Sequence, residues 1–244
     1  MTRPPAARRG GRAARLARAD RVDRPGAAPP PDPNSVTDPD ALTRAGLDAP
    51  RGRAGPDRVL VVACGALARE ILAIRDQAGL THVDLHCLPA ILHNHPDRIV
   101  PAVEAALAAR PGYGRAFVAY GDCGTGGALA AACARLGVEM IDAPHCYAFL
   151  EGPAFDARDE IDAFYLTDFL ARQFDAFVTR PLGLDRHPEL RETYFGRYAK
   201  LVYLAQTDDP ALTRAARAAA DALGLAFERR ATGLAPFADR LAGL

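Results

Sequence analysis

The sequence predicts an α/β protein with a Rossmann-like, mainly parallel sheet of about six strands and a helical insertion. Two observations support this fold class. Apolar runs of strand length alternate with stretches in which aliphatic residues recur every three or four positions, which is typical of parallel βαβ units. The chain has 244 residues, of which 49% are hydrophobic, so it can bury the core of one large α/β domain.

The ordered part of the chain is expected to begin at Arg58. The first strands are expected at residues 59–63, 83–88, 116–120 and 138–142, and the helices between them at 66–77, 96–110 and 127–136. Residues 156–178 carry aromatic side chains at helical spacing and are expected to form the helical insertion, with the aromatic stripe facing the core or lining a cofactor site. Further strands are expected at 201–205 and 225–230, with a helix at 210–223 between them.

Residues 1–56 form a leader rich in Ala, Arg, Pro and Gly, and a single α/β domain is expected at 57–244. The leader has few aliphatic residues and no sustained periodicity, so it cannot bury enough surface to offset the entropy lost on ordering. We therefore expect it to be disordered. A basic recruitment arm is the alternative interpretation, and an over-extended start-codon assignment would explain part of it.

The composition disfavours several classes of partner. The 30 basic and 30 acidic residues balance, and Lys200 is the only lysine, so the arginines follow a coding bias rather than forming a nucleic-acid surface. No apolar run approaches the roughly 18 residues needed to cross a membrane, and no apolar core follows the N-terminal arginines as a secretory signal requires. Five cysteines, an odd number, fit reduced cytoplasmic thiols or metal ligands better than disulfides.

Four cysteines fall where a predicted strand ends: Cys64, Cys87, Cys123 and Cys146. Ligands of parallel α/β sheets bind outside the carboxyl ends of the strands, so these thiols indicate a site. If the first four strands are parallel and adjacent, Cys64, Cys123 and Cys146 will lie at one edge of the sheet. Cys64 also precedes a helix, whose N-terminus would favour the thiolate, although a small buried apolar role is the alternative. Cys133, at aliphatic spacing within a helix, is expected to be structural.

A glycine-rich turn, Gly-Asp-Cys-Gly-Thr-Gly-Gly at residues 121–127, joins the third strand to the next helix. Its glycines permit positive φ angles and could present amide donors, so Gly121, Gly124 and Gly126 are predicted to contact a cofactor. Asp122 is predicted to orient a ligand or to act as a catalytic acid or base. The turn lacks the Lys-Ser/Thr of a P-loop and the spacing of a dinucleotide fingerprint, which disfavours a nucleotide.

Histidines accompany these strand ends and extend the possible ligand set. His86 precedes Cys87, His145 precedes Cys146, and His93 and His95 stand just before a helix. Tetrahedral zinc takes Cys and His ligands, and iron–sulfur clusters favour thiolates. No Cys-x-x-Cys pair occurs, which argues against a zinc ribbon or a ferredoxin-type loop.

Several motifs together resemble an uncharacterised family of bacteria and methanogens, the domain of unknown function numbered 1638. The resemblance covers residues 59–234 and excludes the first 56 residues. The motifs are Ala-Cys64-Gly-Ala-Leu, Leu-His93-Asn94-x-Pro96-x-x-Ile99, Tyr120-Gly-x-Cys123-Gly, His145-Cys146, Leu166-Thr-Asp-Phe-Leu and Leu182-Gly-Leu-Asp185. The family has no established activity. Its members are often encoded beside corrinoid proteins, methyltransferases and their reductive activators, which implies a role in one-carbon metabolism.

The resemblance also selects among the possible ligands, because Cys87 and His95 are less regular in the family pattern. The leading hypothesis is a metal centre held by Cys64, His93, Cys123 and Cys146, with zinc favoured over an iron–sulfur cluster and with His86, His95 or His145 as substitutes for His93. It would serve corrinoid-linked methyl transfer, as an enzyme or as an accessory factor beside a corrinoid protein or methyltransferase. The alternatives are a metal-free enzyme with Cys123 as nucleophile and His145 or His93 as base, and a non-catalytic corrinoid- or pterin-binding protein.

Overall fold

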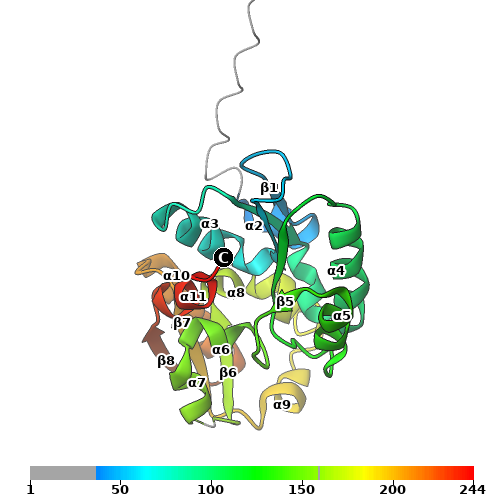
Figure 1. Cartoon of the computed structure of the whole chain (residues 1–244). Coiled ribbons are helices and arrows are strands. Elements are labelled where there is room, and N and C mark those ends of the chain that lie inside the picture. Colours follow the sequence, from blue (N-terminus) through cyan, green and yellow to red (C-terminus); the bar gives the residue numbers. More distant parts are fainter. Residues whose placement is uncertain (1–36, 159) are drawn as a thin grey trace, which may run out of the picture. The chain divides into compact units, whose positions relative to one another are not determined.

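The computed structural model describes residues 37–158 and 160–244 of the chain. Within them, eight strands form two sheets, and helices connect the strands (Figure 1). Sheet A has the order β1-β3-β2-β4-β5 and sheet B the order β6-β7-β8. The predicted α/β class is confirmed.

Sheet A is built around β2 (Val59–Cys64), in which every residue is buried. The strands β3 (Val83–Leu88) and β4 (Arg115–Ala119) pair with it in parallel, one on each side. The short strand β5 (Glu139–Met140) extends the sheet in parallel beside β4. The chain passes from β2 to β3 on one side of β2 and then to β4 on the other side, so the strand order reverses at β2. In parallel α/β sheets a crevice forms at such a reversal, and it is therefore expected at the carboxyl ends of β2 and β4.

Most helices around sheet A lie where the aliphatic periodicity predicts them. A three-residue 3₁₀ turn, η1 (Gly65–Leu67), leads from β2 into α3 (Ala68–Gln77). After β3 the chain forms the 3₁₀ turns η2 (Ala90–Asn94) and η3 (Pro96–Arg98) and then α4 (Ile99–Ala108). The helix α5 (Ala128–Leu136) connects β4 to β5. These turns and helices place the residues after β2, β3 and β4 at one end of the sheet.

Sheet B is fully parallel and consists of β6 (Ala163–Thr167), β7 (Lys200–Ala205) and β8 (Ala226–Ala231). The helix α10 (Pro210–Leu223), capped by the Asp209 carboxylate, connects β7 to β8 at the predicted residues. The remaining elements are α6 (Cys146–Glu151), α7 (Pro153–Arg158), α8 (Asp168–Arg172), a π-helical turn η4 (Asp175–Thr179), α9 (Leu190–Phe195) and α11 (Ala235–Leu241). One cluster of buried apolar side chains includes residues of both sheets.

The strands therefore occupy two sheets rather than the single six-stranded sheet that we expected. The strand β6 lies inside residues 156–178, which were predicted to be wholly helical. Aromatic and β-branched residues in Ala-Phe-Tyr-Leu-Thr at 163–167 favour a strand, and a short apolar run of this kind fits a helix or a strand equally well by periodicity. The aromatic residues around β6 do not form one stripe of a single helix: Phe169 and Phe177 are buried in this core, whereas Phe164 and Phe174 pack against it partly buried.

Part of the predicted leader is structured. The helix α2 (Pro39–Arg44) begins after Asp38, whose carboxylate accepts hydrogen bonds from the Asp40 and Ala41 amides. Its Leu42 is 1% exposed, and β1 (Leu47–Ala49) pairs with β3 in the antiparallel sense. The sequence signal for these two short elements is too local to stand out from the surrounding Pro and Gly. Residues 1–36 lie outside the described part of the chain.

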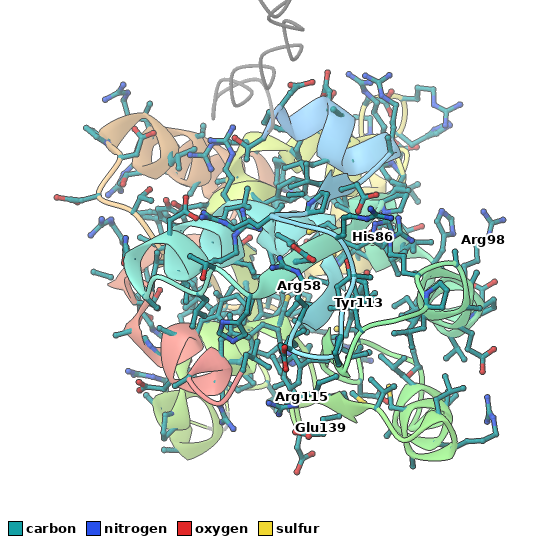
Figure 2. The ribbon with its side chains drawn as sticks, turned by 45° about the horizontal axis from the view of Figure 1, so that its top comes forward. Arg58, His86, Arg98, Tyr113, Arg115 and Glu139 are labelled. Atoms are coloured by element: carbon teal, nitrogen blue, oxygen red, sulfur yellow. The ribbon has the colours of Figure 1, made fainter. Side chains whose placement is uncertain are left out.

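The amino ends of sheet A carry paired charges (Figure 2). Arg58, just before β2, donates from Nε to Oδ2 of Asp84 at 2.9 Å, and the Asp84 side chain is 2% exposed. The Tyr113 hydroxyl also hydrogen-bonds the Asp84 carboxylate. Arg115, the first residue of β4, donates to Glu139 of β5 at 2.8 Å. These ion pairs connect neighbouring strands at the end of the sheet opposite Cys64.

Candidate functional site

Four residues from four separate segments line one small cavity at the carboxyl ends of β2 and β4. They are the predicted ligands Cys64, His93, Cys123 and Cys146. The cavity has a volume of about 20 Å³, which is room for about one water molecule. Tyr120 and Thr167 are the other polar residues in its wall. The prediction that Cys64, Cys123 and Cys146 meet requires adjacent parallel strands, and β2, β4 and β5 are adjacent and parallel.

Cys64 is the last residue of β2, and its side chain is buried. Burial is the main cause that raises the pKa of this thiol to about 12, and the nearby Cys123 contributes to the same shift. The helix after Cys64 was predicted to favour the thiolate, but burial outweighs this effect. The helix α3 begins only after the η1 turn, and the hydrogen bond from the Ala66 amide lowers the pKa of Cys64 by less than burial raises it. In the absence of a cation, Cys64 is a neutral thiol.

The loop after β4 holds Cys123 in an unusual conformation. Cys123 has a φ of +49° and is the one non-glycine residue with positive φ in the described chain. Such a conformation costs about 1 to 3 kcal/mol and persists only where its surroundings impose it. The Cys123 amide donates to the Pro144 carbonyl at 2.9 Å, and the Asp122 amide donates to the Ala143 carbonyl at 2.8 Å. These two bonds connect the loops after β4 and β5, and so bring Cys123 beside Cys146.

Asp122 organises this loop through its carboxylate. It accepts hydrogen bonds from the Thr125 hydroxyl at 2.8 Å and from the Gly126 and Gly127 amides at 3.0 and 2.6 Å. The Gly127 amide, followed by the Thr125 hydroxyl, lowers the pKa of Asp122. Asp122 is not among the residues that line the described cavities near the cysteines. A catalytic role for it remains a prediction.

The three glycines that we predicted to bind a cofactor each shape the loop. A Cβ on Gly121 would lie 2.7 Å from the Ala143 oxygen, so only glycine allows the close approach of the two loops. Gly124 and Gly126 have positive φ angles of 82° and 62°. Because the Gly126 amide is bonded to Asp122, it is not free to bind an anion. Contacts of these glycines with a cofactor also remain a prediction.

Cys146 and His93 complete the cavity wall from the other side. Cys146 is the first residue of α6 and is half-buried, and the surrounding protein raises the pKa of its thiol well above the usual range. His93 is an exposed residue. Partial desolvation by the neighbouring protein, and secondarily the nearby His145, lowers the pKa of His93, which favours the neutral imidazole at pH 7. A neutral imidazole is the form that binds metals.

The remaining cysteines and histidines lie apart from this cavity. Cys87 is fully buried within β3, and Cys133 is buried on α5, which agrees with the predicted structural role. His86 lies 3.3 Å from Asp48 on the neighbouring β1. The His145 ring packs against Tyr147 and Phe155, with centroids 5.1 and 5.0 Å away, and His95 lines a second, larger pocket.

Two polar residues near the cysteines were missed by sequence reasoning. The Tyr120 hydroxyl is buried near the Cys64 thiol and has no hydrogen-bond partner in the described residues. Glu70, on the first turn of α3, is 7% exposed, and its Oε2 has no hydrogen-bond partner in the same part of the chain. Burial, and then the charge of Asp168, raises the pKa of Glu70 to about 7. Tyr120 could have been found from its place in the Tyr-Gly-x-Cys motif, whereas Glu70 has no comparable sequence signal.

The larger pocket adjoins the cysteine cavity and has a volume of about 500 Å³. His93 and Leu170 line both spaces, so they form the boundary between them. No group of three or more His, Cys, Asp or Glu side chains in residues 37–158 and 160–244 is arranged to hold a metal ion. The zinc ion and its ligand set accordingly stay predictions. In the same residues, no helix is long and apolar enough to cross a membrane.

The structure is that of an α/β protein with a cysteine-lined cavity at the carboxyl ends of its first sheet. The chain belongs to the family DUF1638, a protein of unknown function, whose family model matches residues 87–241. The predicted resemblance to this family is confirmed. The match includes His93, Cys123 and Cys146, and begins after Cys64. No curated protein and no solved structure matches the chain.

Proposed function

We propose that the cavity at the carboxyl ends of β2 and β4 is a metal centre with Cys64, Cys123, Cys146 and His93 as ligands. The observation that supports the proposal is the convergence of these four donors on one cavity of about 20 Å³. Three cysteines and one histidine are a common ligand set of tetrahedral zinc. Among residues 37–158 and 160–244, no aspartate or glutamate lines the cavity, so thiolates would supply the negative charge that balances the cation.

Binding of the metal ion would be coupled to the release of protons from the thiols. Protein surroundings raise the pKa of Cys64, Cys123 and Cys146, so all three are neutral thiols before the cation arrives. A bound cation reverses this preference and releases thiol protons, which makes affinity rise with pH. The side chains would also have to move closer to one another, since they do not form a ready ligand group. The Tyr120 hydroxyl, which lies near Cys64, could then donate to the Cys64 thiolate and hold it in place.

The position of His93 is relevant to whether the proposed zinc ion would be catalytic or structural. A catalytic zinc keeps one position open for water or substrate, whereas a structural zinc is closed by four protein ligands. Cys64, Cys123 and Cys146 would hold the ion, and His93, which also borders the larger pocket, is the ligand that a substrate could replace. Bound zinc would act as a Lewis acid on that substrate.

We further propose that this centre serves corrinoid-linked methyl transfer in the cytoplasm, as an enzyme or as an accessory factor. This part of the proposal rests on the gene-neighbourhood pattern of the family described above. The free state of all five cysteines is compatible with a reducing compartment. The partner would be a corrinoid protein or a methyltransferase.

A second candidate function is a metal-free cysteine enzyme with Cys123 as the nucleophile. The observation that favours it is the positive φ of Cys123 on a turn between strand and helix, since strained turns of this kind expose nucleophiles in other enzymes. His93 or His145 would act as the base. The raised pKa of Cys123 argues against this candidate, because the reactive form is the thiolate. Alkylation rates measured against pH test it: a thiol titrating well below ~8.5 would favour the nucleophile.

Metal analysis of anaerobically purified protein tests the leading proposal. We expect about one zinc per chain in the wild-type protein, a large loss in Cys123→Ser and Cys146→Ser, and no loss in Cys133→Ser. Cys133 is the matched control because it is a buried thiol on α5, outside the cavity. Substoichiometric zinc and iron in the wild type, unchanged in Cys123→Ser, would contradict the proposal.

A further inference from the structure

The pocket that adjoins the cysteine cavity has the size of a small-molecule site. Its volume of about 500 Å³ lies within the range of roughly 300 to 1,000 Å³ that encloses drug-sized ligands. Its walls come from η2, α6, β6, α8, η4 and α9, and from the residues that follow η2 and η4. The π-helical turn η4 supplies two of the wall residues, Phe177 and Val178. Such turns are frequent at functional sites.

The chemistry of the walls selects the kind of ligand. Aromatic and aliphatic side chains form most of the lining, among them Phe164, Phe177 and Phe195, and the described residues contribute no Asp, Glu, Lys or Arg to it. The Asn94 amide group donates to the Phe177 carbonyl at 3.1 Å, so one of its two N–H groups is already used. A charged ligand would leave water without gaining a partner of opposite charge, which costs several kcal/mol.

Three of the four polar side chains in the lining come from one stretch of the chain and give the pocket a direction. His93, Asn94 and His95 are consecutive residues at the end of η2, and His93 also lines the cysteine cavity. The fourth, Tyr147, follows Cys146 in α6. The His93 ring meets the Phe177 ring edge-on, with centroids 6.0 Å apart. A molecule whose apolar body fills the pocket would therefore direct a hydrogen-bonding group at His93 and, beyond it, at Cys123 and Cys146.

We propose that this pocket binds a neutral, largely apolar small molecule that presents one hydrogen-bonding group to His93. The identification of that molecule as the substrate of the metal centre rests on the proposed function, whereas its binding does not. Because the described part of the chain supplies no cationic side chain to the lining, nucleotides and other phosphates are disfavoured as ligands. A whole corrinoid is larger than the molecules that a pocket of this volume encloses.

Two fluorescent dyes with the same ring system test this class. Phenylnaphthylamine is neutral, and anilinonaphthalene sulfonate carries one negative charge on otherwise the same skeleton. We expect the neutral dye to bind the full-length protein saturably, at about one site per chain, and at least about tenfold more tightly than the sulfonate. Equal affinities, or tighter binding of the sulfonate, would overturn the proposed class.

Charge substitutions in the wall locate the binding. Leu182→Arg places a cation in the pocket at a half-buried position, and should weaken binding of the neutral dye about tenfold or more. Leu136→Arg makes the same change at an exposed position of α5 and should leave the affinity unchanged. If Leu182→Arg fails to fold, as judged by circular dichroism, Ile91→Arg supplies a second half-buried wall position. Unchanged dye affinity in a folded wall variant would overturn the proposal.

Two further measurements complete the test. The variant Cys123→Ser should lose metal but bind the neutral dye as the wild type does, so the failure of the metal proposal and that of the pocket proposal are distinguishable. Sedimentation velocity with and without the dye tests whether a second copy of the chain covers the pocket. A dimer that becomes monomeric in Leu182→Arg, and whose wild-type form excludes the dye, would overturn the small-molecule assignment.

Discussion

The two ends of sheet A differ in how their polar groups are satisfied. At the amino ends, the buried charge of Asp84 is matched by Arg58, and Arg115 pairs with Glu139 across β4 and β5. At the carboxyl ends, the thiols are uncharged, the Tyr120 hydroxyl has no hydrogen-bond partner in the described chain, and Cys123 is held at positive φ. Paired charges connect strands, whereas strained and under-satisfied groups concentrate at functional sites. If the proposed function is correct, stability and function depend on opposite ends of the sheet, and mutations should separate them.

The largest expected effect is at the amino end. Asp84→Ala leaves Arg58 partly buried without its carboxylate and removes the acceptor of the Arg51 amide. We expect a loss of about 3 kcal/mol in the free energy of unfolding, measured by urea denaturation. Glu104→Gln, in an exposed pair with Arg135, is the control and should change stability by less than about 0.5 kcal/mol. Equal effects of the two substitutions would contradict the assignment of a stabilising role to the amino end.

The substitution Gly121→Ala should act on both stability and the site. Its new Cβ would lie 2.7 Å from the Ala143 oxygen and 2.9 Å from the His145 Cα, so the loops after β4 and β5 must separate. We expect a loss of about 2 kcal/mol in stability and weaker metal binding, measured by thermal unfolding and by metal content. Gly55→Ala is the matched control, because its Cβ would meet only the Arg53 oxygen at 4.0 Å. Full metal content in Gly121→Ala would show that the close approach of these loops does not matter to the site.

The buried carboxyl of Glu70 should make stability depend on pH. Burial raises its pKa to about 7 from an unfolded value near ~4.3, so the folded state binds the proton more tightly. The stabilisation is complete below the unfolded pKa and is lost as pH rises through about 7.

The measurement is the free energy of unfolding between pH 4 and 8, in wild type and in Glu70→Gln. We expect a decline of about 1 to 3 kcal/mol across this range in the wild type and a flatter profile in the variant. Glu104→Gln, the exposed substitution used above, should keep the wild-type slope. Identical slopes in Glu70→Gln and the wild type would rule out Glu70 as the cause.

The smallest expected effect concerns Asp122. Asp122→Ala removes the acceptor of the Thr125 hydroxyl and of the Gly126 and Gly127 amides, so the loop should loosen by about 1 kcal/mol. If Asp122 only shapes the loop, Asp122→Asn, which keeps a carbonyl acceptor, should restore most of the stability and the metal content. A variant Asp122→Asn that is as stable as the wild type but inactive in a future assay would instead support the predicted acid–base role.

Much of the fold could be predicted from periodicity. The helix at 210–223 and the strands around β2 and β3 lie where the aliphatic pattern predicts them, because a long amphipathic helix and a fully buried strand have distinct signatures. The strand β6 could not be distinguished from a helix, since its five residues form a short apolar run. The division into two sheets could not be predicted either, because it depends on which strands pair and not on where each strand lies.

The candidate site was predicted in part for a topological reason. The residues at the carboxyl ends of β2, β4 and β5 must lie near one another, because these strands are adjacent and parallel. This adjacency brings Cys64, Cys123 and Cys146 together. The partner of the Asp122 carboxylate could not be foreseen, since it depends on the φ angles of the glycines after it. The burial of Glu70 likewise depends on how α3 packs, which its local sequence does not reveal.

Cobalt(II) titration of the metal-free protein tests the central claim most directly, because thiolate–cobalt bonds give charge-transfer absorption that scales with the number of thiolate ligands. We expect saturation at about one cobalt per chain, a spectrum typical of tetrahedral thiolate coordination, and displacement by zinc. Cys123→Ser and Cys146→Ser should each reduce the charge-transfer intensity, whereas Cys133→Ser should match the wild type. A wild-type protein that develops no thiolate–cobalt absorption, or one whose absorption persists in Cys123→Ser and disappears in Cys133→Ser, would contradict a metal centre at the carboxyl end of sheet A.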